Sequence, residues 1–235
     1  MCSPNSIVGV YQKLSIWEKA KYTLAASLFI TVTYFLTQNL VTFSSLSLLL
    51  PADSLIPFVP EFIWIYHTLA PVLILSCIFI IKDESNFKKT GLAFIITAIV
   101  LNIFYIVMPS FYPREEFEIS GVASWLVSLT RELDGSNNTF PSGHVALSWL
   151  LLLSMQRVKS IRSNIIANTS FFLWAAGICL STLFLKQHYL VDVVSGIFLA
   201  HMSNHYAQKI YHMKKPAWAA GSSEADEQTV PQLAE

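Results

Sequence analysis

Long apolar runs separated by short charged turns dominate the chain. About 20 apolar residues are needed for a helix to span the hydrocarbon core of a bilayer, and most of these runs approach that length. The predicted spans cover residues 22–40, 62–81, 91–108, 144–155, 165–184 and 189–206. Residues 41–60 are also apolar, but Pro51, Pro57, Pro60 and Asp53 interrupt them, which predicts an interfacial or re-entrant loop. The pattern as a whole predicts an all-α membrane bundle of six transmembrane helices.

Polar segments flank and interrupt this bundle. Residues 1–21 mix apolar and charged positions, which predicts an amphipathic N-terminal segment in the cytoplasm or at the membrane surface. Residues 22–207 form the predicted membrane domain. Residues 208–235 begin basic and end polar and acidic, as expected of a disordered cytoplasmic tail. Residues 109–140 form the longest polar stretch between spans, and Trp125-Leu126-Val127 predict a short surface helix within it.

Composition supports a membrane protein and excludes some partners. Of the 235 residues, 54% are hydrophobic and 13% are charged, whereas soluble domains carry about 25% charged residues. The net charge is zero, so no general attraction to nucleic acid is expected. Cys77 and Cys179 lie inside apolar runs and Cys2 lies near the N-terminus, a distribution that argues against a disulfide framework.

The basic residues predict an orientation. With six spans, twelve of the fifteen Lys and Arg side chains fall on one side of the membrane, which should be the cytoplasmic side. The three exceptions are Arg114, Arg131 and Lys186, on the opposite side. They share that side with the polar stretch 109–140. Cations that break a charge bias indicate an anionic ligand there, although some of them could instead pair with nearby glutamates.

One candidate for an anion site is the sequence Phe140-Pro141-Ser142-Gly143-His144, where a turn-rich loop meets an apolar run. Pro141 suits the first turn of a helix. Ser142 and Gly143 would then lie at the helix N-terminus, where free N–H groups and the helix dipole attract anions. His144 follows at once, so a phosphate beside an imidazole is one interpretation. The other is a capped helix start with an incidental histidine.

A second candidate lies at the junction of the last two predicted spans, where His188 precedes Asp192 by four residues. On a helix the two side chains share one face, so the carboxylate can accept the imidazole N–H. This interaction would leave the other ring nitrogen free to attack. An unpaired carboxylate inside a span is costly, so a partner for Asp192 is expected. The alternative is a structural His–Asp pair that holds two helices together.

Together, Pro141-Ser142-Gly143-His144 and the Ser181…His188-x-x-x-Asp192 block resemble the type 2 phosphatidic acid phosphatase superfamily. The resemblance covers about residues 114–196. It implies a six-helix catalytic membrane domain with His188 as a nucleophile that forms a phosphohistidine. It further implies that Asp192 orients His188, that His144 protonates the leaving group, and that Ser142 and Gly143 hold phosphate oxygens.

The chain departs from the family pattern at its cationic positions. Arg114 can stand for the arginine of the first motif, but Val107 occupies its lysine position and Glu115 its proline position. The third motif begins Ser181-Thr182 instead of Ser-Arg. Ser181 remains a candidate phosphate ligand, and Lys186 could replace a missing cation. Such reduced outer motifs also resemble sphingomyelin synthase and inositol phosphorylceramide synthase.

These features lead to the expected function, a membrane lipid phosphatase that acts on a lipid phosphomonoester or diphosphate at the non-cytoplasmic face. That face would be periplasmic, extracellular or the lumen of an organelle. The mechanism requires no metal and no cofactor, and the expected partners are the lipid phosphate and membrane lipids. Two alternatives stay open. One is a lipid phosphotransferase with the same histidines, and the other is a non-catalytic transporter or degenerate family member.

Overall fold

The computed structural model describes residues 14–41 and 46–213, and its regular elements are helices. Extended pairing in these ranges is limited to isolated bridges between Leu46 and Ser110 and between Phe111 and Asn137. The elements are α1 (Ile16–Leu40), η1 (Pro51–Leu55), η2 (Pro60–Phe62), α2 (Ile63–Tyr66), α3 (Leu69–Leu75), η3 (Ser76–Ile80), α4 (Glu84–Val107), α5 (Val122–Leu133), α6 (Gly143–Met155), α7 (Lys159–Arg162), α8 (Ile165–Phe184) and α9 (Leu190–Met213). The expectation of a helical chain is confirmed for these residues. Residues 1–13 of the predicted N-terminal segment and 214–235 of the predicted tail lie outside them.

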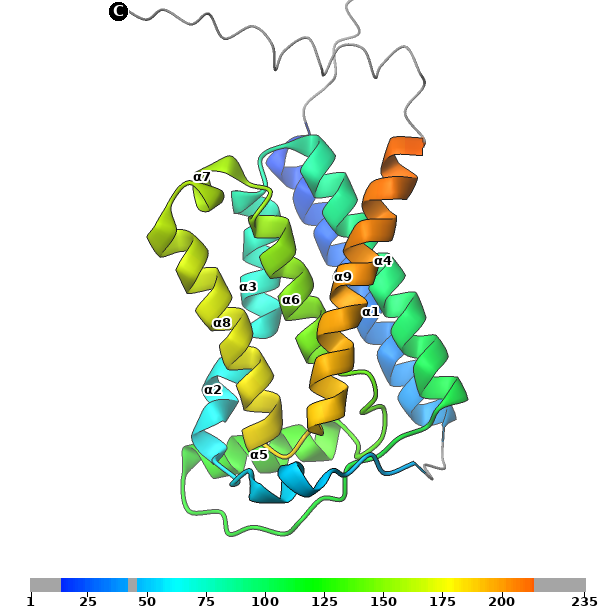
Figure 1. Cartoon of the computed structure of the whole chain (residues 1–235), viewed down its shortest axis with the longest axis vertical. Helices are drawn as coiled ribbons and strands as arrows, with labels where there is room; N and C mark the ends of the chain where they lie inside the picture. The colour runs from blue at the N-terminus through cyan, green and yellow to red at the C-terminus, as the bar shows by residue number, and fades with distance from the viewer. Residues whose placement is uncertain (1–13, 42–45, 214–235) are drawn as a thin grey trace, which may run out of the picture.

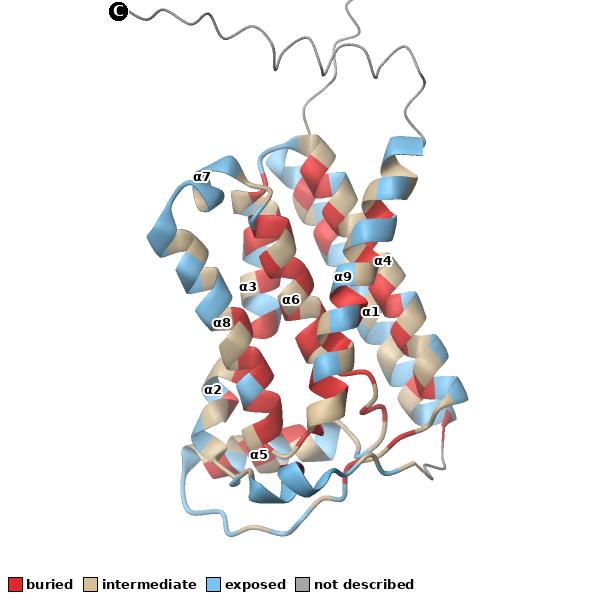
Figure 2. Ribbon diagram, viewed as in Figure 1, coloured by how far each residue is buried: buried red, intermediate tan, exposed pale blue. Residues whose placement is uncertain are grey.

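Several helices have the length and surface of membrane-spanning segments. In the described ranges, Pro60–Ile80, Glu84–Val107 and Ile165–Phe184 are long and apolar enough to cross a bilayer. Large apolar side chains cover the outward faces of the bundle, as Leu28 (64% exposed), Ile106 (57%) and Phe198 (63%) illustrate, and Figure 2 shows these exposed outer faces in blue. Exposure of so much apolar surface is unfavourable in water, whereas lipid chains solvate it. The chain is therefore a membrane protein.

The helices pack around a central group formed by α4, α6 and α9, which contact one another. The helix α1 packs against α4, and α8 packs against α6. Figure 1 shows α5 lying across one end of the bundle, next to the starts of α6 and α9. We call this the α5 end. The opposite end, called the α7 end, holds α7, the starts of α1 and α4, and the end of α9.

Polar turn residues start the long helices. Ser15 caps α1 in a reciprocal box, because its side chain accepts from Glu18 N (3.2 Å) while Ser15 N donates to the Glu18 carboxylate (2.8 Å). Asp83 caps α4 by accepting from Asn86 N at 2.6 Å. The structure thus differs from the predicted boundary at residue 21. Residues 16–21 are the first turns of α1 instead of a separate surface helix, since Ser15 supplies the start signal.

The second predicted span, residues 62–81, is a chain of short helical pieces instead of one helix. Pro71 explains the break between α2 and α3, because a proline ring clashes with the carbonyl four residues earlier, here that of His67. His67 and Thr68 form the connecting turn. The last helix differs in the other direction, since α9 continues to Met213, beyond the predicted end at residue 206.

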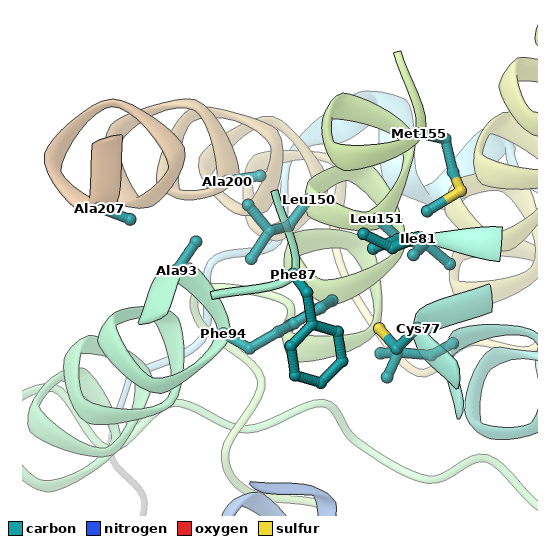
Figure 3. Close-up of a cluster of buried hydrophobic side chains, with 11 residues drawn as sticks. Cys77, Ile81, Phe87, Ala93, Phe94, Leu150, Leu151, Met155, Ala200 and Ala207 are labelled. Atoms are coloured by element: carbon teal, nitrogen blue, oxygen red, sulfur yellow. The ribbon is translucent and has the colours of Figure 1, made fainter. Parts of the chain in front are cut away.

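Buried apolar side chains from α3, η3, α4, α6 and α9 form the largest core cluster, in which Ala207 of α9 lies near Ala93 of α4, and Ala200 of α9 lies near Leu150 of α6 (Figure 3). At the α5 end the loop before α2 is held by a buried carboxylate. Asp53 is 2% exposed and accepts from Leu50 N and Leu190 N, both at 2.8 Å. The described part of the predicted re-entrant loop, residues 46–60, therefore caps the start of α9 and lies across the α5 end (Figure 1).

Candidate active site

The starts of α6 and α9 touch at the α5 end. Ser142 is the N-cap of α6, and its own N–H donates to the carbonyl of Asp192 at 3.1 Å. The Asp192 carboxylate in turn accepts from Tyr189 N at 2.9 Å, which caps α9. Gly196 permits this contact, because a Cβ atom there would lie 2.8 Å from the Ser142 carbonyl oxygen. These contacts bring together two segments of the chain that each carry a histidine.

The two histidines, His144 and His188, face one another across this junction. Their ring centroids are 6.5 Å apart. Nδ1 of His188 lies 2.8 Å from the carbonyl oxygen of Thr139 and 3.5 Å from the Asp192 carboxylate. Since a carbonyl oxygen only accepts, Nδ1 carries the hydrogen, and Nε2 of the neutral ring keeps its lone pair.

The geometry of the His188–Asp192 pair differs from the one expected on a helix. His188 precedes α9, which begins at Leu190. The carboxylate of Asp192 is still close, but Tyr189 N is its nearer partner, and the Thr139 carbonyl is the nearer partner of the imidazole. Orientation of the His188 ring is therefore divided between a backbone carbonyl and a carboxylate.

His144 has an aromatic neighbour from the second helical segment. The ring of Tyr66 stacks on the imidazole with centroids 4.1 Å apart and an interplanar angle of 23°. The Tyr66 hydroxyl lies 3.4 Å from Nδ1 of His144. Tyr66 is 3% exposed, so a buried ring covers one face of the His144 imidazole.

A cavity of about 20 Å³ separates the two histidines from the polar loop. It is lined by Tyr34, Tyr105, Arg114, Asp134, Gly135, Asn137, Asn138, Thr139, Gly143, His144, Gln187 and His188. Buried amide groups at its edge have no hydrogen-bond partner within the described chain, namely the nitrogen of Gln187 and both polar atoms of Asn138. Buried polar atoms normally have a partner, so these amides are free to bind a polar ligand.

Arg114 supplies the positive charge of this cavity. Its guanidinium donates to the Gln187 side-chain oxygen and to the carbonyls of Gly135 (2.7 Å) and Asp134 (3.2 Å). Burial lowers the pKa of Arg114, and the negative charge of the Asp134 carboxylate opposes that shift. Burial likewise raises the pKa of Asp134, and the hydrogen bond from Tyr34 and the charge of Arg114 act against it. Because the Arg114 guanidinium and the Asp134 carboxylate line the same cavity, their opposite charges leave it with little net charge.

The end of α8 turns Gln187 and His188 toward the cavity. Lys186 adopts a left-handed conformation (φ 53°) just after the helix. The N–H groups of Lys186 and Gln187 then donate to the carbonyls of Leu183 (3.1 Å) and Thr182 (3.0 Å), which is the Schellman pattern of helix termination. The turn sends the Lys186 side chain the other way, where Nζ donates to the Asp53 carbonyl at 3.1 Å.

The structure therefore separates the sequence-predicted phosphate ligands into two groups. Arg114 and Gly143 line the cavity together with both histidines. Ser142, Ser181 and Lys186 do not line it, since Ser142 caps α6, Ser181 donates to the Ile178 carbonyl and Lys186 reaches Asp53. The roles of all these residues remain predictions.

Arg131, the third exceptional cation, lies outside the cavity. Its guanidinium donates to the carbonyls of Glu115 (2.8 Å) and Leu185 (3.2 Å), and it lies over the ring of Phe117 at 4.8 Å. Burial lowers the pKa of Arg131 to about 10. Its neighbours are carbonyls and rings, so it joins α5 to the end of α8.

Sequence reasoning missed Thr139, Gln187, Asn138 and Tyr66. Thr139 contributes a backbone carbonyl, which leaves no signature in the sequence. Gln187 reaches the cavity because Lys186 adopts the left-handed conformation. That conformation is uncommon for a residue other than glycine, so nothing in the sequence indicated it. Tyr66 lies far from the motifs in the sequence and looks like any interfacial aromatic residue. The adjacency of Asn138 to the Pro141–His144 motif was the one usable signal.

Comparison with known proteins places this helical membrane protein with its histidine pair in a family. The profile of the PAP2 superfamily matches residues 40–205. The chain belongs to the PAP2 superfamily, a group of phosphatase-type enzymes. A similar solved structure is that of LpxE from Aquifex aeolicus, with 17% sequence identity, 69% of this chain and 88% of that chain covered, and a TM-score of 0.46. No curated protein matches the sequence.

The geometry predicts that Arg114 and Arg131 respond differently to the same substitution. Arg114→Lys keeps a charge but loses the planar set of donors. Because hydrogen bonds to charged groups contribute about 1.5–3 kcal/mol, kcat/KM for a phosphorylated substrate should fall about 10- to 100-fold. Arg131→Lys, the matched control, should lower the thermal unfolding temperature in detergent with a much smaller loss of kcat/KM. Equal losses of kcat/KM in the two variants would contradict a role of Arg114 in phosphate binding.

Proposed function

We propose that the protein is a membrane lipid phosphatase that hydrolyses a phosphomonoester or diphosphate of a lipid through a phosphohistidine. The observation that carries this proposal is the pair His144 and His188, 6.5 Å apart on one cavity with Arg114. Nδ1 of His188 is engaged by the Thr139 carbonyl, so Nε2 is available as the attacking atom. Membership of the PAP2 superfamily supports a phosphatase-type reaction.

In the first step Nε2 of His188 attacks phosphorus, and the bond from phosphorus to the leaving oxygen breaks. His144 gives its proton to that oxygen. The imidazole of His188 becomes positively charged as the N–P bond forms, and the Thr139 carbonyl and the Asp192 carboxylate stabilise the charge. Arg114, the Gly143 N–H and the free amides of Gln187 and Asn138 hold the phosphoryl oxygens.

In the second step water replaces the leaving alcohol. His144, now neutral, accepts a proton from water, whose oxygen attacks phosphorus while the N–P bond breaks. Phosphate leaves and both histidines return to their initial states. We propose that no metal takes part, because side chains and N–H groups provide the charge stabilisation. In residues 14–41 and 46–213 no group of three or more His, Cys, Asp or Glu side chains is arranged to hold a metal ion.

We further propose six membrane spans, formed by α1, the α2–η3 segment, α4, α6, α8 and α9, with the α5 end on the non-cytoplasmic side. The distribution of basic residues supports this orientation, since Lys19 belongs to the first turn of α1, Lys82 precedes α4 and Arg162 ends α7. These parts of the three helices lie at the α7 end (Figure 1). The chemistry would then take place outside the cytoplasm.

A lipid phosphotransferase is the second candidate, and the charge of the cavity favours it. Arg114 is the one Lys or Arg among the described residues that line the cavity, and the Asp134 carboxylate lines it too. A phosphomonoester brings about two negative charges, whereas a phosphodiester brings one and needs less compensation. Transfer would follow the same first step, with a lipid alcohol in place of water in the second.

The principal test is phosphate release by the purified protein in detergent. With phosphatidate, phosphatidylglycerol phosphate, polyprenyl diphosphate and a sphingoid phosphate as substrates, at least one should yield inorganic phosphate, with activity retained in EDTA. Loss of activity in EDTA that a divalent ion restores would overturn the metal-free mechanism. Incubation with a phospholipid and ceramide or diacylglycerol separates the candidates, since a transferase would form a new phospholipid without free phosphate.

A second prediction separates the two histidines. His188→Ala should abolish turnover and the acid-labile phosphoenzyme. His144→Ala should lower hydrolysis of a lipid phosphate by about 10²–10⁴-fold, the usual contribution of general acid catalysis. Nitrophenyl phosphate has an acidic leaving group and should lose less in the first step, so phosphoenzyme can accumulate. A normal phosphoenzyme or unchanged turnover in His188→Ala would reject this residue as the nucleophile. Absence of turnover with every substrate in the unmodified protein would favour a non-catalytic protein.

A third prediction concerns sidedness. Ser120, before α5, and Ser163, between α7 and α8, are both exposed and suit replacement by a single cysteine. In a background in which the native cysteines are replaced by serine, an impermeant maleimide should label the Ser120→Cys protein in intact cells or sealed right-side-out vesicles. The Ser163→Cys protein should be labelled only after permeabilisation. The reverse pattern would place the site in the cytoplasm.

A further inference from the structure

A second and much larger cavity lies inside the bundle, between α1, α3, α4 and α6. Its volume is about 450 Å³, within the range of ligand pockets in proteins. Apolar side chains dominate its wall, among them Ile30, Leu73, Ala98, Leu101 and Leu147. The reaction steps proposed above place no part of the substrate in this space, and its chemistry suits a hydrocarbon chain.

The large cavity adjoins the cavity of the histidines. Tyr34, Tyr105, Asp134, Gly143 and His144 line both. Of the two histidines, His188 lines only the small cavity. His144 therefore stands between a polar space that contains the nucleophile and an apolar space that does not. Tyr66, which stacks on His144, belongs to the wall of the large cavity.

The large cavity reaches the outer surface of the bundle. Its inner wall is buried, since Leu101 is 4% exposed and Tyr105 is 1% exposed. Ala70 on α3 is exposed, and Phe35 on α1 is 39% exposed, although both line the same cavity. The mouth thus lies on the side of the bundle at α1 and α3, where apolar outer surface faces lipid. A chain could enter from the membrane without crossing water.

From this arrangement we propose that the large cavity binds the hydrocarbon chain of the leaving lipid alcohol. The proposal rests on the proposed function, in which His144 protonates the leaving oxygen. The group attached to that oxygen must lie on the His144 side of the phosphorus atom, because attack by His188 comes from the opposite side. On the His144 side the described chain offers the apolar cavity, and His144 is one of the residues that form the boundary between this cavity and the polar site.

The cavity acts mainly through orientation. A hydrocarbon chain leaves surroundings that are as apolar as the cavity wall, so its transfer contributes little driving force. Holding the chain in one direction fixes the phosphorus atom between the two imidazoles, and a small misplacement of reacting groups can reduce the rate up to about 100-fold. Obstructing the cavity should therefore affect the turnover of long-chain substrates more than their binding.

Ala70→Trp tests the proposal, since it adds a large side chain at the mouth. We expect the ratio of kcat/KM for a dioleoyl lipid phosphate to that for nitrophenyl phosphate to fall about 10- to 100-fold. Ala25→Trp is the matched control, because Ala25 is exposed on α1 and does not line the cavity. Its ratio should match that of the unmodified protein. An unchanged ratio in Ala70→Trp, with both substrates still hydrolysed, would overturn the cavity proposal and leave the phosphatase function standing.

A binding experiment on the unmodified protein separates failure of the cavity from failure of the function. A diacylglycerol with a diazirine in the middle of one chain is photolysed in vesicles containing the full chain, and crosslinked peptides are mapped by mass spectrometry. Crosslinks should concentrate on Leu73, Leu101 and Leu147. Crosslinks confined to outward residues such as Leu28 and Phe198 would overturn the proposal, even if phosphate release had been demonstrated. Crosslinks in the cavity without phosphate release from any substrate would reject the phosphatase function alone.

Discussion

The backbone tie between the Thr139–Ser142 loop and the start of α9 is the constraint on which the site depends. Ser142 N–H donates to the Asp192 carbonyl, and the Thr139 carbonyl accepts from the His188 ring. Gly196 lets the two segments approach this closely. A backbone group takes part in each of these contacts, so the fold itself fixes the relative position of the two histidines. Side-chain rotamers then have little freedom to alter it.

The charged group of the site is also held in place before any ligand binds. Arg114 is already oriented by the Gly135 carbonyl and the Gln187 side chain, so a phosphoryl group would meet a donor that needs little rearrangement. Preorganised donors stabilise charge that develops in a transition state better than mobile ones do. The cations expected from the family pattern at Val107 and Thr182 are absent, and the cavity instead contains the neutral amides of Gln187 and Asn138, which offer hydrogen-bond donors without adding charge.

The sequence predicted the helices well because lipid leaves few alternatives. A chain in hydrocarbon must satisfy its backbone internally, so long apolar runs become helices, and α4 and α8 appear near their predicted positions. The motif histidines were also evident from their spacing. What escaped prediction depends on tertiary contact. Lys186 turns away because α8 ends in a left-handed residue, and the partner of His188 is a carbonyl that any residue could supply.

The central helices are fixed at both ends. At the α7 end, Arg157 follows α6 and donates to Asn86 (2.7 Å) and Thr90 (3.1 Å) of α4 and to Asn204 of α9. At the α5 end the backbone tie joins α6 to α9. The mouth of the large cavity lies outside this group, at α1 and α3. Movement of these outer elements to admit a hydrocarbon chain would therefore leave the spacing of the two histidines unchanged.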